Sequence, residues 1–564
     1  MEDIMTRKLD LYRVTGIILL GLLCFFSQAA TANEALYTTS KKTYTKTFSR
    51  NVTAAPGKML QIDGPQADLT ITAWDRPEIV VEGKVEVGDS DENFLKDFLS
   101  DAEISIVSSD EGYRIRLDSP LYEGSRGRSG RFKEMRKILR SGSMNFSFAA
   151  TLNIHVPIEQ SLDVNNSFGD VTVNEVRGRL EIRNESGKVK ITGCGGNLRL
   201  NNSFAAVEVD NFSGPVEIAN ESGSVVLKNI GGAAVIHSSF EEVNFMNIDG
   251  PLTIRSESSR IVGSDVEGEC QITSSFQLID IRGVRKGLKI RGESSEIKVD
   301  DIQNDAFIES SFAPVTVKNI GGNLRVVSES ALVSAEAIKG DADIRTSFQS
   351  ITVGSVGGGV KIEGESSNVT VRDVEGNVAV KSSFGAVAAS DIRGFLEIKS
   401  ESARIKAADI KKYADIISSF NAIEVQRVNE DVSVKGESSS VLVEDAGGNV
   451  TVDNSFNYVI LKRTQGSITI RGESSSVDIS QIKKLPSGSK IDVKTTFNPI
   501  LLSLPQEAEV TISAFTEFGN VRSDYPIYIQ QAGDRRMASS PQQKGTVVRL
   551  ETSGDITIKK GSLN

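Results

Sequence analysis

The chain has 564 residues, of which 25% are charged, and a formal net charge of −11 at pH 7. A general nucleic-acid binder needs a basic face that neutralises phosphates, so this acidic balance argues against that class and against nucleic acid as a partner. The length would ordinarily suggest several domains, but a strict internal repeat replaces that estimate.

Residues 1–32 have the pattern of a secretory signal peptide. A basic start at Arg7, Lys8 and Arg13 precedes a short apolar run, and an A-x-A cleavage site ends at Ala32. The apolar run is shorter than a comfortable membrane span. We therefore expect an exported protein of the periplasm or cell surface, without a transmembrane segment once the signal peptide is removed.

Residues 33–160 lack the repeat and predict an N-terminal β-rich domain. Such a domain would cover the first coil of the repeats, because an open coil pairs edge to edge with other molecules. A basic loop, residues 120–147, interrupts it. We interpret this loop either as a solvated segment or as an anion-binding arm. The candidate contacts of that arm are Arg126, Arg128, Arg131, Lys133, Arg136, Lys137 and Arg140.

A repeat of constant length fills residues 161–485. Phenylalanine recurs nine times at a step of 36 residues, and glutamate keeps the same step. The phenylalanines are Phe168, Phe204, Phe240, Phe276, Phe312, Phe348, Phe384, Phe420 and Phe456. The glutamates are Glu185, Glu221, Glu257, Glu293, Glu329, Glu365, Glu401, Glu437 and Glu473.

The structural unit is half as long as this step. When the glutamate half is aligned on the phenylalanine half, Ser186 matches Phe168 and the period becomes 18 residues. Counted from this landmark, position +3 is Val or Ile in all 18 units. Positions +3 and +5, like +12 and +14, are apolar and two residues apart, which is the period of a β-strand. Glycine fills position +10 in 13 of 17 units, as expected for a corner with positive φ.

One unit cannot bury its own apolar face, so the units must stack. The pattern predicts an all-β fold, namely a parallel β-solenoid (β-helix) of about 18 coils of 18 residues. With parallel strands about 4.8 Å apart, the rod would be roughly 86 Å long. A coil of 36 residues is a weaker alternative, because the two halves share one apolar template.

Two explanations fit a phenylalanine in every second coil. The ring could pack inside a narrow corner across two coil heights, with a small serine in the intervening coil. Alternatively, the alternation records the duplication of a 36-residue pair. If the rings are buried, Phe312→Ala should open the middle coils to protease, since truncating a buried ring costs roughly 3–5 kcal/mol.

Residues 486–564 lose the register and predict a C-terminal cap and tail of the solenoid. Phe497 follows Phe456 after 41 residues instead of 36, and the segment around Phe518 repeats the motif once more. Atypical terminal units are typical of caps in repeat proteins.

No singular set of residues for chemistry emerges, so we predict no catalytic residue, metal or cofactor. His155 and His237 have no companion at metal-ligand spacing. Cys194 and Cys270 fall at core positions four coils apart, too far for a disulfide, and should be buried thiols. The glutamate series is the only ordered ionisable array. It either keeps the corner soluble, paired with the Arg or Lys found two residues earlier in six of nine cases, or forms a row of carboxylates for cations or a glycan.

Several phrases resemble a bacterial adhesin-labelled family, a domain of unknown function with S-G-D-V-x-V repeats. They are Ser167–Val173, Ser553–Ile556, the Ile71–Arg76 strand and the His155–Pro157 approach to the repeats. The resemblance covers most of residues 45–560 and implies a β-solenoid. It implies no catalytic or binding residue, and most coils here carry S-S-F or E-S-S in place of S-G-D.

These observations lead to one functional hypothesis and two alternatives. We expect an exported, non-enzymatic adhesin or scaffold of the cell envelope that presents an extended face to an envelope glycan or another envelope protein. The first alternative is a carbohydrate-active or glycan-binding β-helix protein. The second is a polymer-forming envelope scaffold of the bactofilin type, although bactofilins are intracellular and need open ends.

Overall fold

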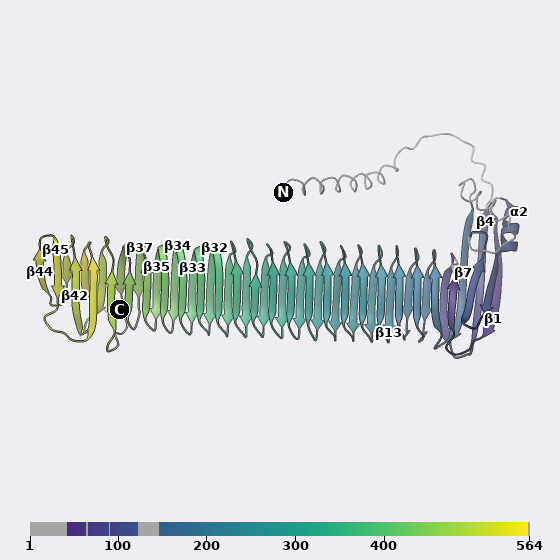
Figure 1. The fold of residues 1–564 in the computed structure, drawn as a ribbon, viewed down its shortest axis with the longest axis horizontal. Helices are drawn as coiled ribbons and strands as arrows, with labels where there is room; N and C mark the ends of the chain where they lie inside the picture. Colours follow the sequence, from purple (N-terminus) through teal and green to yellow (C-terminus); the bar gives the residue numbers. More distant parts are fainter. Residues whose placement is uncertain (1–41, 64–65, 90, 122–145, 562–564) are drawn as a thin grey trace, which may run out of the picture.

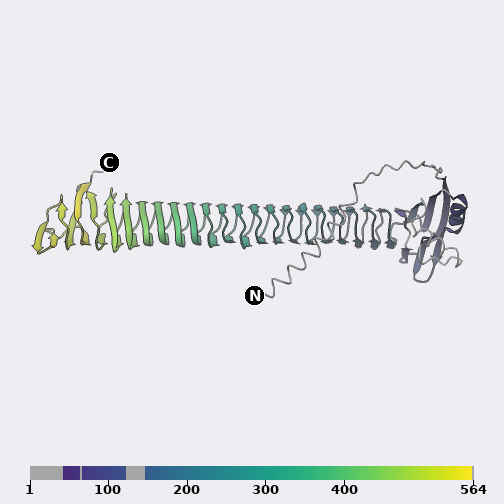
Figure 2. The same cartoon turned by 90° about the horizontal axis from the view of Figure 1, so that it is seen from above.

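The computed structural model describes residues 42–63, 66–89, 91–121 and 146–561. They form a straight rod of stacked β-coils with a wider β-domain at its N-terminal end (Figure 1). Seen from above, the rod is narrow along its whole length (Figure 2). The predicted signal peptide and the seven cations of the basic loop lie outside the described residues.

Each coil contributes one strand to each of two parallel sheets. The first sheet contains β8 (Ser161–Asn166), β10 (Leu180–Asn184), β12 (Leu198–Asn202), β14 (Val216–Asn220), β16 (Ala234–Ser238), β18 (Leu252–Ser256), β20 (Cys270–Ser274), β22 (Leu288–Gly292), β24 (Ala306–Ser310), β26 (Leu324–Ser328), β28 (Ala342–Arg345) and β30 (Val360–Gly364). The second sheet contains β9 (Val171–Asn174), β11 (Val189–Thr192), β13 (Val207–Phe212), β15 (Val225–Ile230), β17 (Val243–Ile248), β19 (Ile261–Val266), β21 (Ile279–Val284), β23 (Ile297–Ile302), β25 (Val315–Ile320), β27 (Val333–Ile338), β29 (Ile351–Val356) and β31 (Val369–Val374).

The next strands continue both sheets towards the C-terminus. Four of them run through both sheets without a break: β32 (Val378–Ile392), β33 (Leu396–Ile410), β34 (Ala414–Val428) and β35 (Val432–Ala446). After them β36 (Val450–Asn454) and β38 (Ile468–Arg471) extend the first sheet, and β37 (Phe456–Lys462) and β39 (Ser474–Ser480) extend the second.

The register confirms the predicted β-solenoid of about 18 coils between residues 162 and 480. Val189 pairs with Val171 on one side and with Val207 on the other, so equivalent residues stack one coil apart. The apolar positions +3, +5, +12 and +14 face the space between the sheets, where Val171, Val173, Leu180 and Ile182 are completely buried. The period-2 alternation therefore becomes a continuous core along the rod axis.

The glycine corner differs from the prediction in its physical reason. Most glycines at position +10 do not have positive φ, Gly196 and Gly466 being exceptions. They are favoured because consecutive corners lie backbone to backbone, and a Cβ built on Gly214 would come within 1.8 Å of the Gly196 carbonyl oxygen.

The left-handed residue of each coil lies three positions earlier, at +7. All 18 coils have positive φ there, and their pairing skips this residue: Asp210 pairs with Lys228 and Phe212 with Ile230, while Asn211 is left out. Because adjacent coils leave out equivalent residues, the register is kept and the chain bends here towards the glycine corner. The 18 residues are Glu175, Gly193, Asn211, Asn229, Asn247, Asp265, Gly283, Asp301, Asn319, Ala337, Ser355, Asp373, Asp391, Asp409, Arg427, Asp445, Arg463 and Gln481.

The N-terminal domain shares both sheets with the rod. Its elements are β1 (Lys42–Thr53), β2 (Met59–Asp63), β3 (Asp68–Trp74), β4 (Glu78–Asp89), α2 (Glu92–Asp101), β5 (Glu103–Ser108), β6 (Gly112–Asp118) and β7 (Ser147–Pro157). Strands β2 and β3 pair in parallel with β8 and β9, so these two strands extend the stack by one coil. Beyond them β7, β4 and β1 continue one sheet, and β6 and β5 continue the other.

The C-terminal end departs from chain order. Its strands are β40 (Lys490–Lys494), β41 (Ile500–Pro505), β42 (Val510–Thr516), β43 (Val521–Ser523), β44 (Tyr528–Ala532), β45 (Arg535–Ser539), β46 (Thr546–Thr552) and β47 (Ile556–Gly561). The last two strands insert between the coil of β40 and β41 and the coil of β42 and β43. An antiparallel hairpin of β44 and β45 then ends the first sheet.

Candidate functional site: the phenylalanine edge

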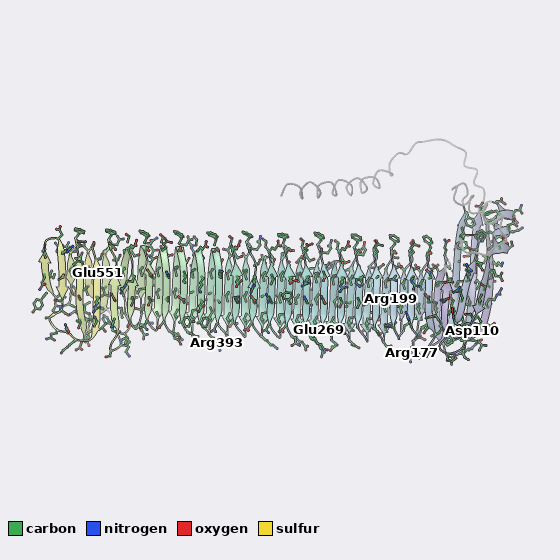
Figure 3. The ribbon with its side chains drawn as sticks, viewed as in Figure 1. Asp110, Arg177, Arg199, Glu269, Arg393 and Glu551 are labelled. Atoms are coloured by element: carbon green, nitrogen blue, oxygen red, sulfur yellow. The ribbon has the colours of Figure 1, made fainter. Side chains whose placement is uncertain are left out.

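The nine repeated phenylalanines are exposed, so the expectation that their rings pack inside the corner is wrong. Phe456 is the least exposed at 46% and Phe276 the most exposed at 65%. They lie at the corner that joins the end of the first sheet to the start of the second. Position +9, represented by Arg177 and Arg393, lies at the opposite, lower edge of the rod (Figure 3).

Small residues of the intervening coils fill the inside of this corner. In each glutamate coil, the residue after the landmark serine is Gly, Ala or Ser and points inward, as the fully buried Ser259, Ser295 and Ala331 show. In the phenylalanine coils the equivalent residue is not buried. Several of these corners have positive φ, either at that residue, as in Gly169 and Asn421, or at the phenylalanine itself, as in Phe276. The two corner conformations alternate, which explains the 36-residue period.

Polar side chains line the same interior and leave no room for a ring. Asn220 is buried, and its amide donates hydrogen bonds to the carbonyl oxygens of Gly223 at 2.7 Å and Ala205 at 3.1 Å. In neighbouring coils the hydroxyls of Ser238 and Ser259 lie 3.1 Å apart. A phenyl ring here would leave these groups without partners at a cost of about 1–3 kcal/mol each.

Serine and phenylalanine therefore alternate along the outside of the edge. Phe384 pairs with Ser402, Phe420 with Ser438 and Phe456 with Ser474 in the adjacent coil. Successive rings are thus two coils apart, or about 9.6 Å at the usual strand spacing. We call this row of exposed rings the phenylalanine edge.

The nine glutamates lie on the same edge, one residue before each landmark serine. All nine are exposed. The predicted pairing with the cation two residues earlier is not formed: Arg183 binds Asp163 and Glu181, Arg291 binds Glu309, and Arg471 binds Asp492. Among the described residues no ion pair involves any of the nine glutamates, so their carboxylates face solvent.

The flat faces of the rod carry a different charge pattern, made of ion pairs between adjacent coils. Examples are Arg199 with Glu217 at 3.2 Å on the first sheet and Lys406 with Glu424 at 3.3 Å on the second. The Arg427 guanidinium donates hydrogen bonds of 2.7 and 2.8 Å to the Asp409 carboxylate and lowers the pKa of that carboxyl. Ion pairs between coils therefore neutralise part of the charge on the faces, at position +7 and at the lower edge, where Arg393 binds Glu375 at 3.1 Å.

The hollows away from the phenylalanine edge include one at the left-handed residues of position +7 and one in the N-terminal domain. A shallow groove of about 880 Å³ follows the left-handed column through Asp301, Ala337 and Asp373 towards the glycine corner. A hollow of about 400 Å³ lies in the N-terminal domain, where Arg76 stacks on Trp74 at 5.0 Å. Sequence reasoning missed both, although the Asn, Asp and Gly residues that recur at position +7 were a signal for the first.

The remaining candidate residues are structural. Cys194 and Cys270 are buried free thiols, as predicted, and burial raises the pKa of Cys270 to about 12. His155 stacks on Trp74 at 5.0 Å. Within the described ranges no group of three His, Cys, Asp or Glu side chains is placed to hold a metal, and no helix is long and apolar enough to cross a membrane.

No family model, curated protein or solved structure matches the chain. The resemblance to the adhesin-labelled family therefore stays a prediction, and the site has to be interpreted from its own geometry.

Proposed function

We propose that the protein is an exported, non-enzymatic scaffold or adhesin of the cell envelope that holds a repetitive partner, with an envelope glycan as the leading candidate. The observation that supports this most directly is the glutamate row. It presents nine exposed carboxylates without ion-pair partners, two coils or about 9.6 Å apart, on a rod whose faces and lower edge pair many of their charges with one another.

A periodic row suits a periodic ligand. Carboxylate oxygens accept hydrogen bonds from the hydroxyls and amides of a polysaccharide, and each contact by itself is weak in water. When many such contacts belong to one polymer, every contact after the first becomes intramolecular, and avidity rises without any single tight site. The solenoid keeps the spacing rigid because each coil is hydrogen-bonded to both neighbours.

A carbohydrate-active enzyme is the second candidate and has less support. Glycoside hydrolysis needs one particular pair of carboxylates, held at a defined separation on either side of the scissile bond. The described glutamates of the edge instead form a uniform series, and none stands out by its ion pairing. The bactofilin-type alternative depends on open ends, whereas here each end of the stack carries strands outside the 18-residue register.

Co-sedimentation with insoluble envelope glycan tests the proposal. The parent protein should sediment with the glycan, and the variant E293Q/E329Q/E365Q should sediment less. The matched control is E267Q/E375Q/E424Q, which removes the same charge from carboxylates that are ion-paired away from the phenylalanine edge and should bind like the parent. A third variant without residues 126–140 tests the basic loop. Equal retention of all four proteins at low and high salt would show that neither charged feature is the contact.

A further inference from the structure

The phenylalanine edge continues where the chain order does not. In the C-terminal stack the coil of Phe497 is followed by the coil of Ser553, and that coil by the coil of Phe518. The amide of Ser553 donates to the Thr496 carbonyl, and the amide of Phe518 donates to the Ser553 carbonyl. Phe497 and Phe518 are exposed like the other nine rings.

This continuation separates the two explanations of the alternation. Duplication of a 36-residue pair orders phenylalanine and serine coils along the sequence, yet Phe518 precedes Ser553 in sequence and follows it in space. The exposed rings therefore still alternate with serines in space, although the chain order is reversed here. The arrangement keeps a surface with one ring in every second coil.

We infer that the phenylalanine edge binds the same edge of a second copy of this chain, in an antiparallel pair of rods. This inference goes beyond the proposed function, because the partner is the chain itself. A second copy has the same spacing between rings because it is the same chain. Its rings can therefore enter the gaps between the rings of the first copy along the whole length of the rod.

The spacing of the rings fits such interdigitation. Rings of one copy are about 9.6 Å apart, so a second ladder displaced by one coil places successive rings about 4.8 Å apart. Aromatic pairs prefer centroid separations of roughly 4.5–7 Å in offset or tilted arrangements. Each incoming ring would lie over a small residue, such as Ser402 between Phe384 and Phe420.

The exposed area is also sufficient. A phenylalanine side chain buries roughly 150–250 Å² when enclosed, so nine half-exposed rings present on the order of 900 Å² per copy. A stable protein interface buries about 800 Å² per partner. Exposed apolar surface on this scale is unusual for a monomer and marks an interaction site.

The N-terminal domain selects the antiparallel arrangement. Leu69 pairs with both Leu152 and Val171, and β7 begins at Ser147, so the domain continues past the level of the phenylalanine edge. Figure 1 shows β4, β7 and α2 rising above the upper edge of the rod. Two parallel rods would bring these projections into collision, whereas antiparallel rods place each projection beyond the C-terminal end of the other.

The two-fold axis of this pair has an electrostatic consequence. It keeps the first sheet of both copies on the same side of the seam, and the glutamates directly follow the first-sheet strands, as Glu185 follows β10. The two glutamate rows therefore lie next to each other and repel. Added salt should strengthen the pairing by screening this repulsion over a Debye length of about 8 Å at physiological ionic strength.

Sedimentation equilibrium over a range of protein and salt concentrations tests the pairing. The parent should form a dimer that tightens with salt. Replacing three central rings in F276S/F312S/F348S introduces the residue that alternate coils carry at this position, and should weaken the dimer at least tenfold with an unchanged circular dichroism spectrum. E293Q/E329Q/E365Q should strengthen the dimer, although the same variant should weaken glycan retention.

Crosslinking tests the orientation. An interdigitated antiparallel pair in full overlap has its two-fold axis midway between the levels of Phe348 and Ser366. S366C should therefore crosslink to itself through a short bismaleimide, and S186C near the rod end should not. Both buried native thiols are silent in this assay. A parent that stays monomeric at 100 micromolar protein, an F276S/F312S/F348S dimer as tight as the parent, or self-crosslinking of S186C would overturn the inference. Loss of glycan binding by a monomeric ring variant would instead assign the edge to the glycan.

Discussion

The hydroxyl of Ser259 lies 3.1 Å from that of Ser238 in the adjacent coil, completely buried inside the corner whose outer side carries Phe240. The contact shows how the corner divides its residues. Small polar groups fill the inside, where some hydrogen-bond to one another or to backbone carbonyls, and the large apolar ring remains in solvent.

The exposure of Phe312 reverses the expected effect of its truncation. Phe312→Ala should change the free energy of unfolding by less than about 0.5 kcal/mol, as is usual for surface substitutions. The matched core variant Ile308→Ala removes a completely buried side chain and should cost about 2–5 kcal/mol. Urea unfolding and limited proteolysis measure both effects. Rapid cleavage of the Phe312 variant in the middle coils would contradict the exposed position.

Asn220 tests the polar interior of the corner. Asn220→Ala leaves the carbonyls of Ala205 and Gly223 without the amide that binds them, and should cost about 1–3 kcal/mol. Asn201→Ala, in the neighbouring strand β12, changes an exposed residue and should have almost no effect on the free energy of unfolding. Equal unfolding midpoints for the two variants would show that the buried amide contributes nothing.

At position +7 most coils carry a residue other than glycine, and the positive φ there strains its backbone. Ala337 has φ of 60°, which costs an L-residue with a Cβ roughly 1–2 kcal/mol relative to glycine. Ala337→Gly should therefore raise the unfolding midpoint, although the added freedom of the unfolded chain reduces the gain. Ala342→Gly, at a buried strand position, should lower it. A lowered midpoint for both would contradict the strain.

Much of the fold could be predicted from sequence because the core is periodic. Val171 and its equivalents repeat at a fixed offset, and burial follows from the alternation of the strand. The direction of Phe168 could not be predicted, because alternation ends at a corner and an apolar side chain there can turn either way. The reversal that places Ser553 between Phe497 and Phe518 depends on pairing between distant segments, which no local pattern encodes.

Cys270 should be inert to thiol reagents in the folded protein. Burial raises the pKa of its thiol to about 12, so almost no reactive thiolate exists at pH 8. Labelling of the mature chain, which lacks Cys24, with a chromogenic disulfide should give less than one thiol per folded chain, and both Cys194 and Cys270 should react in denaturant. Fast labelling of the native protein would show that the coils around Cys270 open readily.

The ionisation of Asp478 should make the free energy of unfolding depend on pH. Burial raises the pKa of this carboxyl, against the opposing charges of Lys462 and Lys559, and its Oδ1 atom has no hydrogen-bond partner. The folded state holds the proton of Asp478 more tightly than the unfolded state does. The protonated carboxyl therefore contributes its full stabilisation below the unfolded pKa of about 3.9, and this stabilisation is lost as pH rises through the folded pKa. Asp478→Asn should therefore stabilise the protein at pH 7 and have little effect at pH 3. Urea unfolding midpoints of parent and variant at pH 3 and pH 7 measure the difference. The control is Asp453→Asn, which changes an exposed carboxyl in β36. A gain that is equal at both pH values would assign the effect to packing and not to the proton.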